Sequence, residues 1–350
     1  MTRVRARGEE VRRFLLENVQ ANPNKINKLA MDKFGITRQA VSLHLQRLVR
    51  EGALSETGKT RGRSYALAPQ AEWQRTYPLA GIAEDIVWRD DIDGALGTLP
   101  DNVRAIWLHG FTEMLNNAID HSGGTAIVVR IRKTAISTAM VLSDNGVGIF
   151  RKIQQAMHLL DERHAVFELS KGKLTTDPQR HSGEGIFFTS RMFDRFNILS
   201  SGVFFSHVLG KAEDWMLQDH EPADGTMVFL DLGNHTARTT KKVFDRFSSG
   251  EDYGFTKTVV PVELAQYGND QLVSRSQAKR VVARLELFKT VVLSFKNVPA
   301  IGQAFADEVF RVFAREHPQI QIIAVDANSE VKRMITRATN ADPGATPDTD

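Results

Sequence analysis

The stretch EMLNNAIDH, residues 113–121, decides the fold of this chain together with DNGVG at residues 144–148. Successive residues of a helix are turned by about 100°, so Glu113, Asn117 and Asp120 fall on one side. Apolar residues fall on the opposite side: Trp107, Phe111, Met114, Leu115 and Ala118. The polar stripe holds carboxylates and amides but neither Lys nor Arg, which is unusual for a merely solvated helix face. The stretch therefore predicts a helix that presents polar groups to a ligand.

Two glycine-containing segments extend this candidate site. DNGVG follows the strand-like residues 136–142, and Gly146 and Gly148 allow the backbone to adopt positive φ and to approach a ligand closely. Further along, HSGEGI at residues 181–186 begins another expected helix, whose free N–H groups suit a phosphate. Each segment alone is also typical of an ordinary turn or a solvated surface. Their order and spacing, with Gly225 and Thr226 opening a late strand, favour a nucleotide site.

These four motifs, spread over residues 85–235, resemble the GHKL (Bergerat-fold) ATP-binding family, which includes gyrase B subunits, histidine kinases and anti-sigma-factor kinases. The resemblance implies an α/β sandwich with a mixed sheet and helices on one face. It implies that Asn117 binds the Mg²⁺ that bridges the ATP phosphates, since Mg²⁺ prefers oxygen ligands. It further implies that Glu113 orients or deprotonates the attacking nucleophile, and that Asp144 accepts a hydrogen bond from the adenine amino group.

The same resemblance assigns the remaining candidate positions. Residues 150–181 would form a mobile lid over the nucleotide. The acidic Glu184 departs from the family's glycine motif and receives no role, and His121 is equally compatible with a capping or surface histidine. The other candidate ATP contacts are Asp120, Gly146, Gly148, Gly183, Gly185 and Thr226, with Lys171, Lys173 and Arg180 of the lid at the phosphates.

Composition limits the classes of protein. The chain has 350 residues, enough for two or three domains. It has no cysteine, which excludes disulfides and thiolate metal sites. We find no run of about 18 apolar residues and no signal-peptide pattern, so we expect a cytoplasmic protein without membrane contact. The charge is uneven: residues 1–70 hold 14 Lys and Arg against 6 Asp and Glu, a net of +8, and the remainder carries −5.

The basic residues 1–70 resemble a winged helix-turn-helix. Residues 9–19 and 24–34 have the pattern of two amphipathic helices, Gly35 begins a tight turn, and Thr37 is a good N-cap for a third helix ending near residue 51. A glycine-punctuated basic segment at 55–63 and a strand at 64–68 would form the wing. In such domains the third helix enters the major groove of double-stranded DNA and the wing contacts phosphates.

Eight residues are therefore candidates for DNA contact. They are Arg38, Gln39, Ser42, His44 and Arg47 on the third helix, and Lys59, Arg61 and Arg63 on the wing. A small basic helical domain that binds a protein partner is the alternative, but the turn, cap and wing coincide with the charge surplus and favour DNA. Winged-helix regulators often bind two half-sites as dimers, so we expect a homodimer.

Residues 244–338 alternate helical and apolar strand patterns, which is typical of an α/β layer domain. We expect helices at 274–287, 302–316 and 328–337, and buried strands at 290–295 and 320–325. The run FKNVPAIGQAFADEVFR, residues 295–311, resembles the STAS-like domain of the DUF4325 type, related to anti-sigma-factor antagonists. Those antagonists bind protein partners and carry a phosphorylated serine in the loop that here, at 298–302, has no hydroxyl. The tail 339–350 is expected to be disordered.

The sequence thus predicts a multidomain α+β regulator: a winged helix at 1–70, a GHKL domain at 85–235 and a STAS-like domain at 244–338. Mg·ATP binding or hydrolysis would order the lid and change how the chain binds DNA. One alternative is a protein serine/threonine kinase of the anti-sigma type, which Glu113 permits. The other is a non-catalytic nucleotide-binding scaffold in partner switching.

Overall fold

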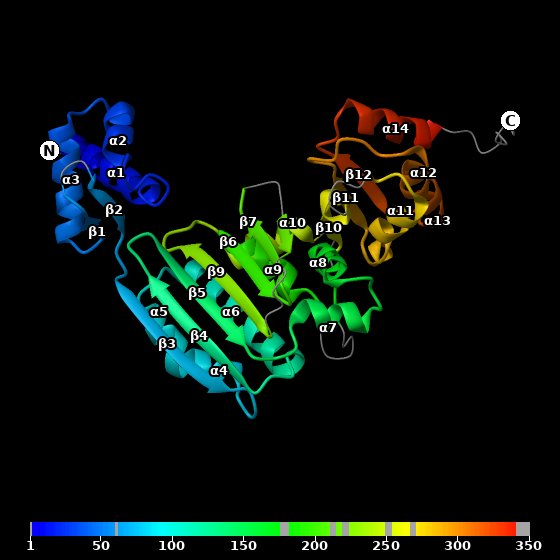
Figure 1. Ribbon diagram of the computed structural model, residues 1–350, viewed down its shortest axis with the longest axis horizontal. Coiled ribbons are helices and arrows are strands. Elements are labelled where there is room, and N and C mark those ends of the chain that lie inside the picture. The colour runs from blue at the N-terminus through cyan, green and yellow to red at the C-terminus, as the bar shows by residue number, and fades with distance from the viewer. Residues whose placement is uncertain are drawn as a thin grey trace, which may run out of the picture.

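The computed structural model describes residues 2–59, 62–175, 182–210, 215–218, 224–248, 254–266 and 271–340. Three units follow one another along the chain, an N-terminal unit (2–67), a central unit (71–233) and a C-terminal unit (257–340), and Figure 1 shows the central unit between the other two. Each contains helices and strands, so the chain has the mixed α and β composition expected of a multidomain α+β protein. Within the described ranges, no helix is long and apolar enough to cross a membrane.

The N-terminal unit contains three helices and a two-stranded antiparallel sheet. The elements are α1 (Thr2–Asn18), α2 (Ile26–Phe34), α3 (Arg38–Arg50), β1 (Leu54–Thr57) and β2 (Ser64–Leu67). Gly35 ends α2 in a left-handed conformation (φ 60°). The Thr37 hydroxyl caps α3 by accepting the N–H of Ala40 at 3.3 Å, as predicted. Helix α1 starts well before the expected residue 9, and buried Val11, Leu15 and Val19 join the core of the unit.

The N-terminal unit is attached closely to one end of the central sheet. Only three residues separate β2 from β3 (Ala71–Pro78). The N–H of Gln70 donates to the carbonyl of Lys133 at 2.7 Å, and Ala135 and Ile136, at the tip of the β4–β5 hairpin, pack on the core of the N-terminal unit. The two units are therefore joined by packing as well as by the chain.

The central unit is built on a seven-stranded sheet in the order β3-β4-β5-β9-β6-β7-β8. The remaining strands are β4 (Ala126–Lys133), β5 (Ser137–Asp144), β6 (Arg195–Ser200), β7 (Val203–Val208), β8 (Trp215–Gln218) and β9 (Thr226–Gly233). All the strand pairs described in this central sheet are antiparallel, so the expectation of a mixed sheet is wrong. Short hairpins such as the two-residue connection between β6 and β7 impose this direction, because parallel neighbours need a long crossover.

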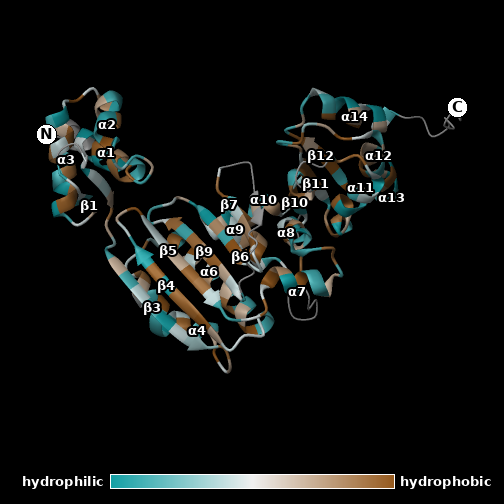
Figure 2. Cartoon of the chain, in the orientation of Figure 1, coloured by the Kyte–Doolittle hydropathy of each residue, from teal (hydrophilic) through white to brown (hydrophobic). Residues whose placement is uncertain are grey.

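The helices of the central unit cover one face of the sheet. Figure 1 shows α4 (Glu84–Val87), α5 (Asp93–Leu96) and α6 (Asp101–His121) behind the strands, with a π-helical segment, Trp88–Ile92, between α4 and α5. The apolar side predicted for residues 107–118 of α6 is buried, as expected. Strand β4 alternates buried Ile127, Val129 and Ile131 with outward residues, as a sheet covered on one side requires. Figure 2 shows apolar segments along the sheet and polar residues over peripheral helices such as α14.

Three further helices lie near the end of the sheet at which β5 ends and β9 begins. They are α7 (Ile149–Ala156), α8 (Glu162–Lys171) and α9 (Gly185–Met192). Helix α10 (Thr240–Phe247) then leads to the C-terminal unit and is capped by the hydroxyl of Thr239. Residues 150–171 of the expected lid are thus mainly helical, and residues 176–181 lie outside the described residues.

The C-terminal unit has a three-stranded parallel sheet in the order β10-β11-β12. Its strands are β10 (Lys257–Pro261), β11 (Thr290–Ser294) and β12 (Gln321–Val325); its helices are α11 (Arg275–Val282), α12 (Gln303–Asp307), a π-helical segment (Glu308–Phe313), α13 (Ala314–Glu316) and α14 (Ser329–Asn340), with short 3-10 turns at Val262–Ala265 and Leu285–Leu287. Strand β10 was not predicted. Strand β12 lies at the edge and is only partly buried, unlike the expected buried strand. Helix α11 ends at Val282, earlier than expected, because the backbone leaves the helical conformation at Ala283 (ψ 132°), and Arg284 then adopts a left-handed conformation (φ 64°).

A half-buried histidine on α6, His109, whose Nε2 atom is buried, predicts a pH dependence of folding. The ring of His109 lies 5.6 Å from that of Phe244, and its Nε2 has no hydrogen-bond partner among the described residues. Burial lowers the pKa of His109 to about 4. The unfolded chain takes up this proton below pH ~6.5, whereas the folded chain stays neutral until pH ~4, so acid favours unfolding in this window. The free energy of unfolding should fall by about 2–3 kcal/mol from this group alone.

The measurement is urea unfolding between pH 7 and 4 for the parent, His109→Leu and the control His235→Leu, since His235 is exposed. His109→Leu should flatten the pH dependence relative to the parent, and His235→Leu should not. An unaltered slope in His109→Leu would show that the pKa of this histidine is the same in the folded and the unfolded chain.

Candidate functional site

A cavity of about 300 Å³ lies beside α6, α7, the start of α9 and the ends of β5, β6 and β9. Its volume is at the lower end of the range for small-molecule sites. Apolar side chains such as Met114, Ile153 and Ile186 form part of the wall. Six residues that the sequence singled out also line it: Glu113, Asn117, Asp144, Gly183, Gly185 and Thr226. Segments more than a hundred residues apart along the chain thus converge on one cavity.

Asp144, the last residue of β5, is held in place by the backbone. Its Oδ1 accepts the N–H of Gly146 at 2.8 Å and the N–H of Thr226 at 3.3 Å. The hydroxyl of Thr226 in turn accepts the N–H of Ile149 at 3.0 Å. Burial raises the pKa of Asp144, and the backbone N–H groups oppose this by stabilising the charged form. The result is a rigidly oriented carboxyl group in the wall of the cavity, suited to accept a hydrogen bond from a ligand N–H group.

Glycines near Asp144 allow segments of the protein to pack closely around this turn. A Cβ on Gly146 would overlap the carbonyl oxygen of Ser122, and one on Gly225 would overlap the carbonyl oxygen of Asp144. Gly148 has φ 88°, whereas Gly146 lies outside the left-handed region. Contrary to the prediction, neither Gly146 nor Gly148 is among the residues that line the cavity. They permit close contact between segments of the protein, which in turn fixes Asp144.

Two of the three residues predicted for the polar stripe of α6, Glu113 and Asn117, line the cavity. Nδ2 of Asn117 is buried without a hydrogen-bond partner among the described residues, and such a group in a native protein calls for a water or ligand. The carboxylate of Glu113 lies against the first turn of α9, where a Cβ on Gly185 would overlap its Oε2. Asp120 is exposed and outside the lining, because α6 turns it toward solvent beyond the cavity. Its predicted role in ligand binding is not supported.

Lys171 and Lys173 lie away from the cavity, in contrast to the prediction that they contact phosphates. The Lys171 side chain is fully buried, and its Nζ donates to Glu168 and to the carbonyls of Arg280 and Ala283. Nζ of Lys173 donates to the carbonyl of Leu287 at 2.9 Å. Both amines are directed to the C-terminal unit. The amine of Lys171 binds carbonyls at the end of α11, where a positive charge is favourable. The third predicted cation, Arg180, lies outside the described residues.

A different lysine lines the cavity, and sequence reasoning missed it. Lys152 lies on α7, and its Nζ donates to the carbonyl of His121 at 2.7 Å. The sequence feature that could have indicated Lys152 is the spacing of Ile149, Lys152 and Ile153. This spacing places the three residues on one helix face, and all three line the cavity. The end of α8 and the residues that follow it belong to the predicted lid and also line the cavity, through Leu169, Leu174 and Thr175. The N–H of Leu174 donates to the carbonyl of Gly183 at 3.1 Å.

In the N-terminal unit, α3 presents a shallow exposed hollow. It is lined by Thr37, Arg38, Gln39, Ser42, Leu43 and Gln46. Lys59 is exposed, and Arg61 lies outside the described residues. Arg47 forms an ion pair with Glu51 at 2.6 Å, and Arg63 forms one with Glu56 at 3.1 Å.

His44 does not share this surface, which corrects its predicted position beside the other α3 residues. It packs toward α1, with its ring 3.7 Å from the position that a Cβ on Gly8 would occupy. Burial lowers the pKa of His44, and the charges of Arg12 and Arg47 lower it further.

Comparison with known families identifies one region of the chain. Residues 277–332 match the model of the STAS-like domain of unknown function (DUF4325). The match runs from α11 into α14 and confirms the STAS-like character predicted for the C-terminal unit. No curated protein matches the chain.

Proposed function

We propose that the chain is an ATP-responsive transcriptional regulator, with a GHKL-type central unit that binds Mg·ATP and an N-terminal winged helix that binds DNA. The observation that carries the proposal is the cavity at residues 113–228, where the motif residues Asn117, Asp144 and Gly183 converge. The amide nitrogen of Asn117, which has no hydrogen-bond partner among the described residues, supports a ligand at this place, because a buried polar group without a partner costs about 1–3 kcal/mol.

The cavity offers a place for the base and a place for the phosphates. Asp144 and Thr226 would contact the adenine, whose amino group is the N–H donor that a fixed carboxylate accepts. The apolar wall, including Met114, Ile153 and Val228, suits the faces of the ring. Gly183 and Gly185 at the start of α9 would bring backbone N–H groups to the phosphates, and Lys152 is a cation at the wall of the same cavity.

The residues present fit a magnesium ion at the phosphates. Asn117 would hold it through the carboxamide oxygen, because the orientation of an amide is exchangeable and its nitrogen has no partner among the described residues. When bound, Mg²⁺ neutralises charge on the phosphates. Glu113 of α6, whose carboxylate lies against the first turn of α9, would orient or deprotonate a nucleophile near the terminal phosphate.

Asn117→Ala tests this assignment. Calorimetric titration with ATP, with and without Mg²⁺, should show that Mg²⁺ strengthens binding to the parent chain but has little effect on the variant. The neighbouring Asn116 does not line the cavity, so Asn116→Ala is the matched control and should retain the parent's dependence on Mg²⁺. An equal effect of Mg²⁺ on the parent and on Asn117→Ala would remove Asn117 from the metal site.

The N-terminal unit supports a DNA-binding role through its charge and shape. Its net charge is +8 over residues 1–70, and α3 presents the polar hollow formed by Arg38, Gln39 and Ser42. We place α3 in the major groove and Lys59 and Arg63 at the phosphates. Dimerisation would supply two half-sites, and the STAS-like unit would bind a protein partner.

A protein serine/threonine kinase is the second candidate, and the position of Glu113 in the cavity wall favours it over a pure scaffold. Incubation with γ-labelled ATP separates these functions. Free phosphate that is lost in Glu113→Gln supports the ATP-hydrolysing regulator, a labelled protein supports the kinase, and neither product supports a non-catalytic role.

A further inference from the structure

One short segment contacts both the cavity and the STAS-like unit. We call residues 168–175, the end of α8 together with residues 172–175, the strap. On one side, Leu169, Leu174 and Thr175 line the cavity. The N–H of Leu174 also donates to the carbonyl of Gly183, so the strap lies directly on the glycine segment of the site. On its other side, the strap contacts β10 and the end of α11.

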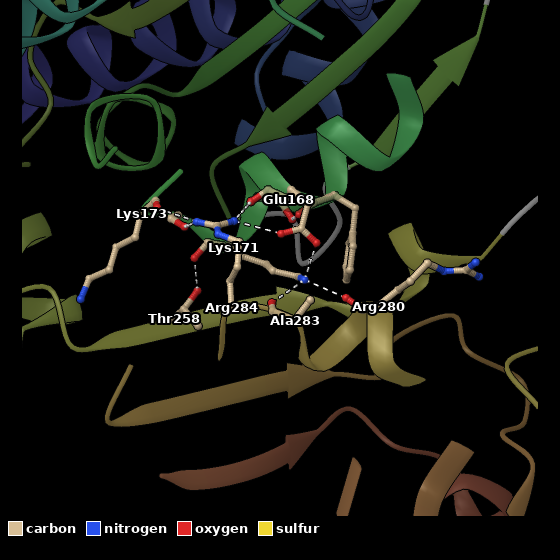
Figure 3. A network of polar contacts seen from close by, with 10 residues as sticks. Glu168, Lys171, Lys173, Thr258, Arg280, Ala283 and Arg284 are labelled. Carbon is tan, nitrogen blue, oxygen red and sulfur yellow. Dashed lines mark hydrogen bonds and ion pairs between the residues drawn. The ribbon is translucent and has the colours of Figure 1, made fainter. Parts of the chain in front are cut away.

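Lys171 joins the strap to α11. Its Nζ donates to Oε1 of Glu168 at 2.7 Å and to the carbonyls of Arg280 and Ala283, both at 2.9 Å (Figure 3). An ammonium group has three donors, so all three are used. The two carbonyls belong to the C-terminal turn of α11, where a cation is favourable. The side chain has no exposed surface, so leaving this position would break all three bonds at once.

Arg284 holds the strap from the opposite unit. One guanidinium nitrogen donates to Oε2 of Glu168 at 2.9 Å, and another donates to the carbonyls of Gly172 at 2.8 Å and Lys173 at 2.5 Å. The hydroxyl of Thr258, on β10, donates to the carbonyl of Lys171 at 2.6 Å. Figure 3 shows these groups converging on the strap. Three consecutive strap carbonyls, at 171–173, are therefore bound by side chains of the C-terminal unit.

Aromatic packing extends this contact to α9, the helix that begins at Gly185. The ring of Phe187, on α9, lies 4.5 Å from that of Phe255, which in turn lies 5.2 Å from that of Phe288. A Cβ on Gly172 would come within 2.9 Å of both Phe255 and Phe187. Because this interior is close-packed, the strap cannot shift without disturbing both α9 and the C-terminal unit.

We propose that the STAS-like unit regulates the ATP site by holding the strap closed against the cavity. Docking of the unit keeps Leu169, Leu174 and Thr175 in the position that completes the cavity wall, and a bound ligand favours the docked arrangement in return. The coupling to a nucleotide rests on the function proposed above, whereas the hold on the strap stands on the contacts alone. Such a coupling is reciprocal, because docking of the STAS-like unit and binding of a ligand favour the same arrangement of the strap.

The test compares Arg284→Gln with Arg333→Gln in the full-length chain. Arg284→Gln removes the bonds to Glu168 and to the strap carbonyls, whereas Arg333 is exposed on α14 and pairs with Glu330. Two quantities are measured: affinity for Mg²⁺ and a non-hydrolysable ATP analogue, and hydrogen exchange of residues 168–175 without ligand. We expect Arg284→Gln to bind the analogue about five- to tenfold more weakly, because the closed wall is less populated. Its strap should also exchange faster, and Arg333→Gln should match the parent in both measurements.

Thr258→Val provides a milder second variant should Arg284→Gln fail to fold, and it should shift both quantities in the same direction by about two- to threefold. If the parent binds the analogue and the variants bind it equally well or more tightly, the regulatory coupling is wrong while the ATP site stands. If the parent binds no nucleotide, the proposed function fails. In that case, the hydrogen-exchange measurement still tests whether the C-terminal unit holds the strap in place. Unchanged hydrogen exchange of residues 168–175 in the variants would overturn this claim, and faster exchange would support it.

Discussion

Replacing Asp144 by asparagine should weaken ATP binding by about 1–3 kcal/mol, or about 5- to 150-fold. The backbone N–H groups of Gly146 and Thr226 fix Oδ1, so an asparagine must direct its carbonyl oxygen toward them. Its NH₂ group then faces the adenine amino group, and two donors meet where a donor and an acceptor met before. Titration calorimetry with ATP measures the loss.

A second nucleotide makes this test specific. Inosine triphosphate has a carbonyl in place of the adenine amino group, so the parent should prefer ATP and Asp144→Asn should lose that preference. Asp231→Asn is the matched control, because Asp231 is also partly buried with its pKa raised by burial but lies outside the cavity lining. Unchanged ATP affinity in Asp144→Asn would remove Asp144 from the adenine role.

Binding of the full-length chain to double-stranded DNA should depend steeply on salt. With about four phosphate contacts, affinity should fall roughly a hundredfold between about 50 and 200 mM salt, because each contact releases counterions. Arg38→Ala and Gln39→Ala, in the exposed hollow on α3, should reduce discrimination between sequences. Lys59→Ala and Arg63→Ala should weaken binding to all sequences alike and lower the salt slope. Gel retardation at several salt concentrations measures these effects.

The structure refines the choice of variants. Arg47 is engaged with Glu51 on the same helix, so Arg47→Ala should have a smaller effect than Arg38→Ala. Arg333→Ala, on the exposed side of α14, is the control and should leave DNA binding unchanged. If no genomic fragment is retarded even at low salt, the N-terminal unit binds a protein partner instead.

The parts of the site that follow from local periodicity could be predicted from the sequence. Glu113 and Asn117 share a helix face because they are one turn apart, and the buried side of α6 follows from the same rule. Thr37 and Gly35 mark helix ends through their own chemistry, and the structure confirms both. In these cases, the residues that determine the structure lie within a few positions of one another.

The parts that depend on distant contacts could not be predicted. Lys171 was assigned to phosphates, yet its partners Arg280 and Ala283 lie 109 and 112 positions along the chain. Helix α11 ends early, before Ala283, and Arg284 follows in a left-handed conformation, which is uncommon for a residue other than glycine. Lys152 has an ordinary helical neighbourhood, and only the packing of α7 directs it to the cavity wall.

The contacts between units offer a physical route by which a ligand in the cavity would influence the N-terminal unit. The N-terminal unit packs on the β4–β5 hairpin through Ala135 and Ile136, and β5 ends at Asp144 in the cavity. The strap connects the same cavity to the STAS-like unit. A ligand in the cavity is therefore in contact with segments that reach both neighbouring units, which is the physical basis for a coupled response.

The most direct test of the central claim is the DNA affinity of the full-length chain with and without Mg²⁺ and a non-hydrolysable ATP analogue, at one salt concentration. We expect the nucleotide to change the DNA affinity, and DNA to change the nucleotide affinity by the same factor, because a coupling free energy is symmetric. Asp144→Asn at the same nucleotide concentration should reduce the change. Identical DNA affinity with and without saturating nucleotide would contradict the account, since the ATP site would then act independently of the DNA-binding unit.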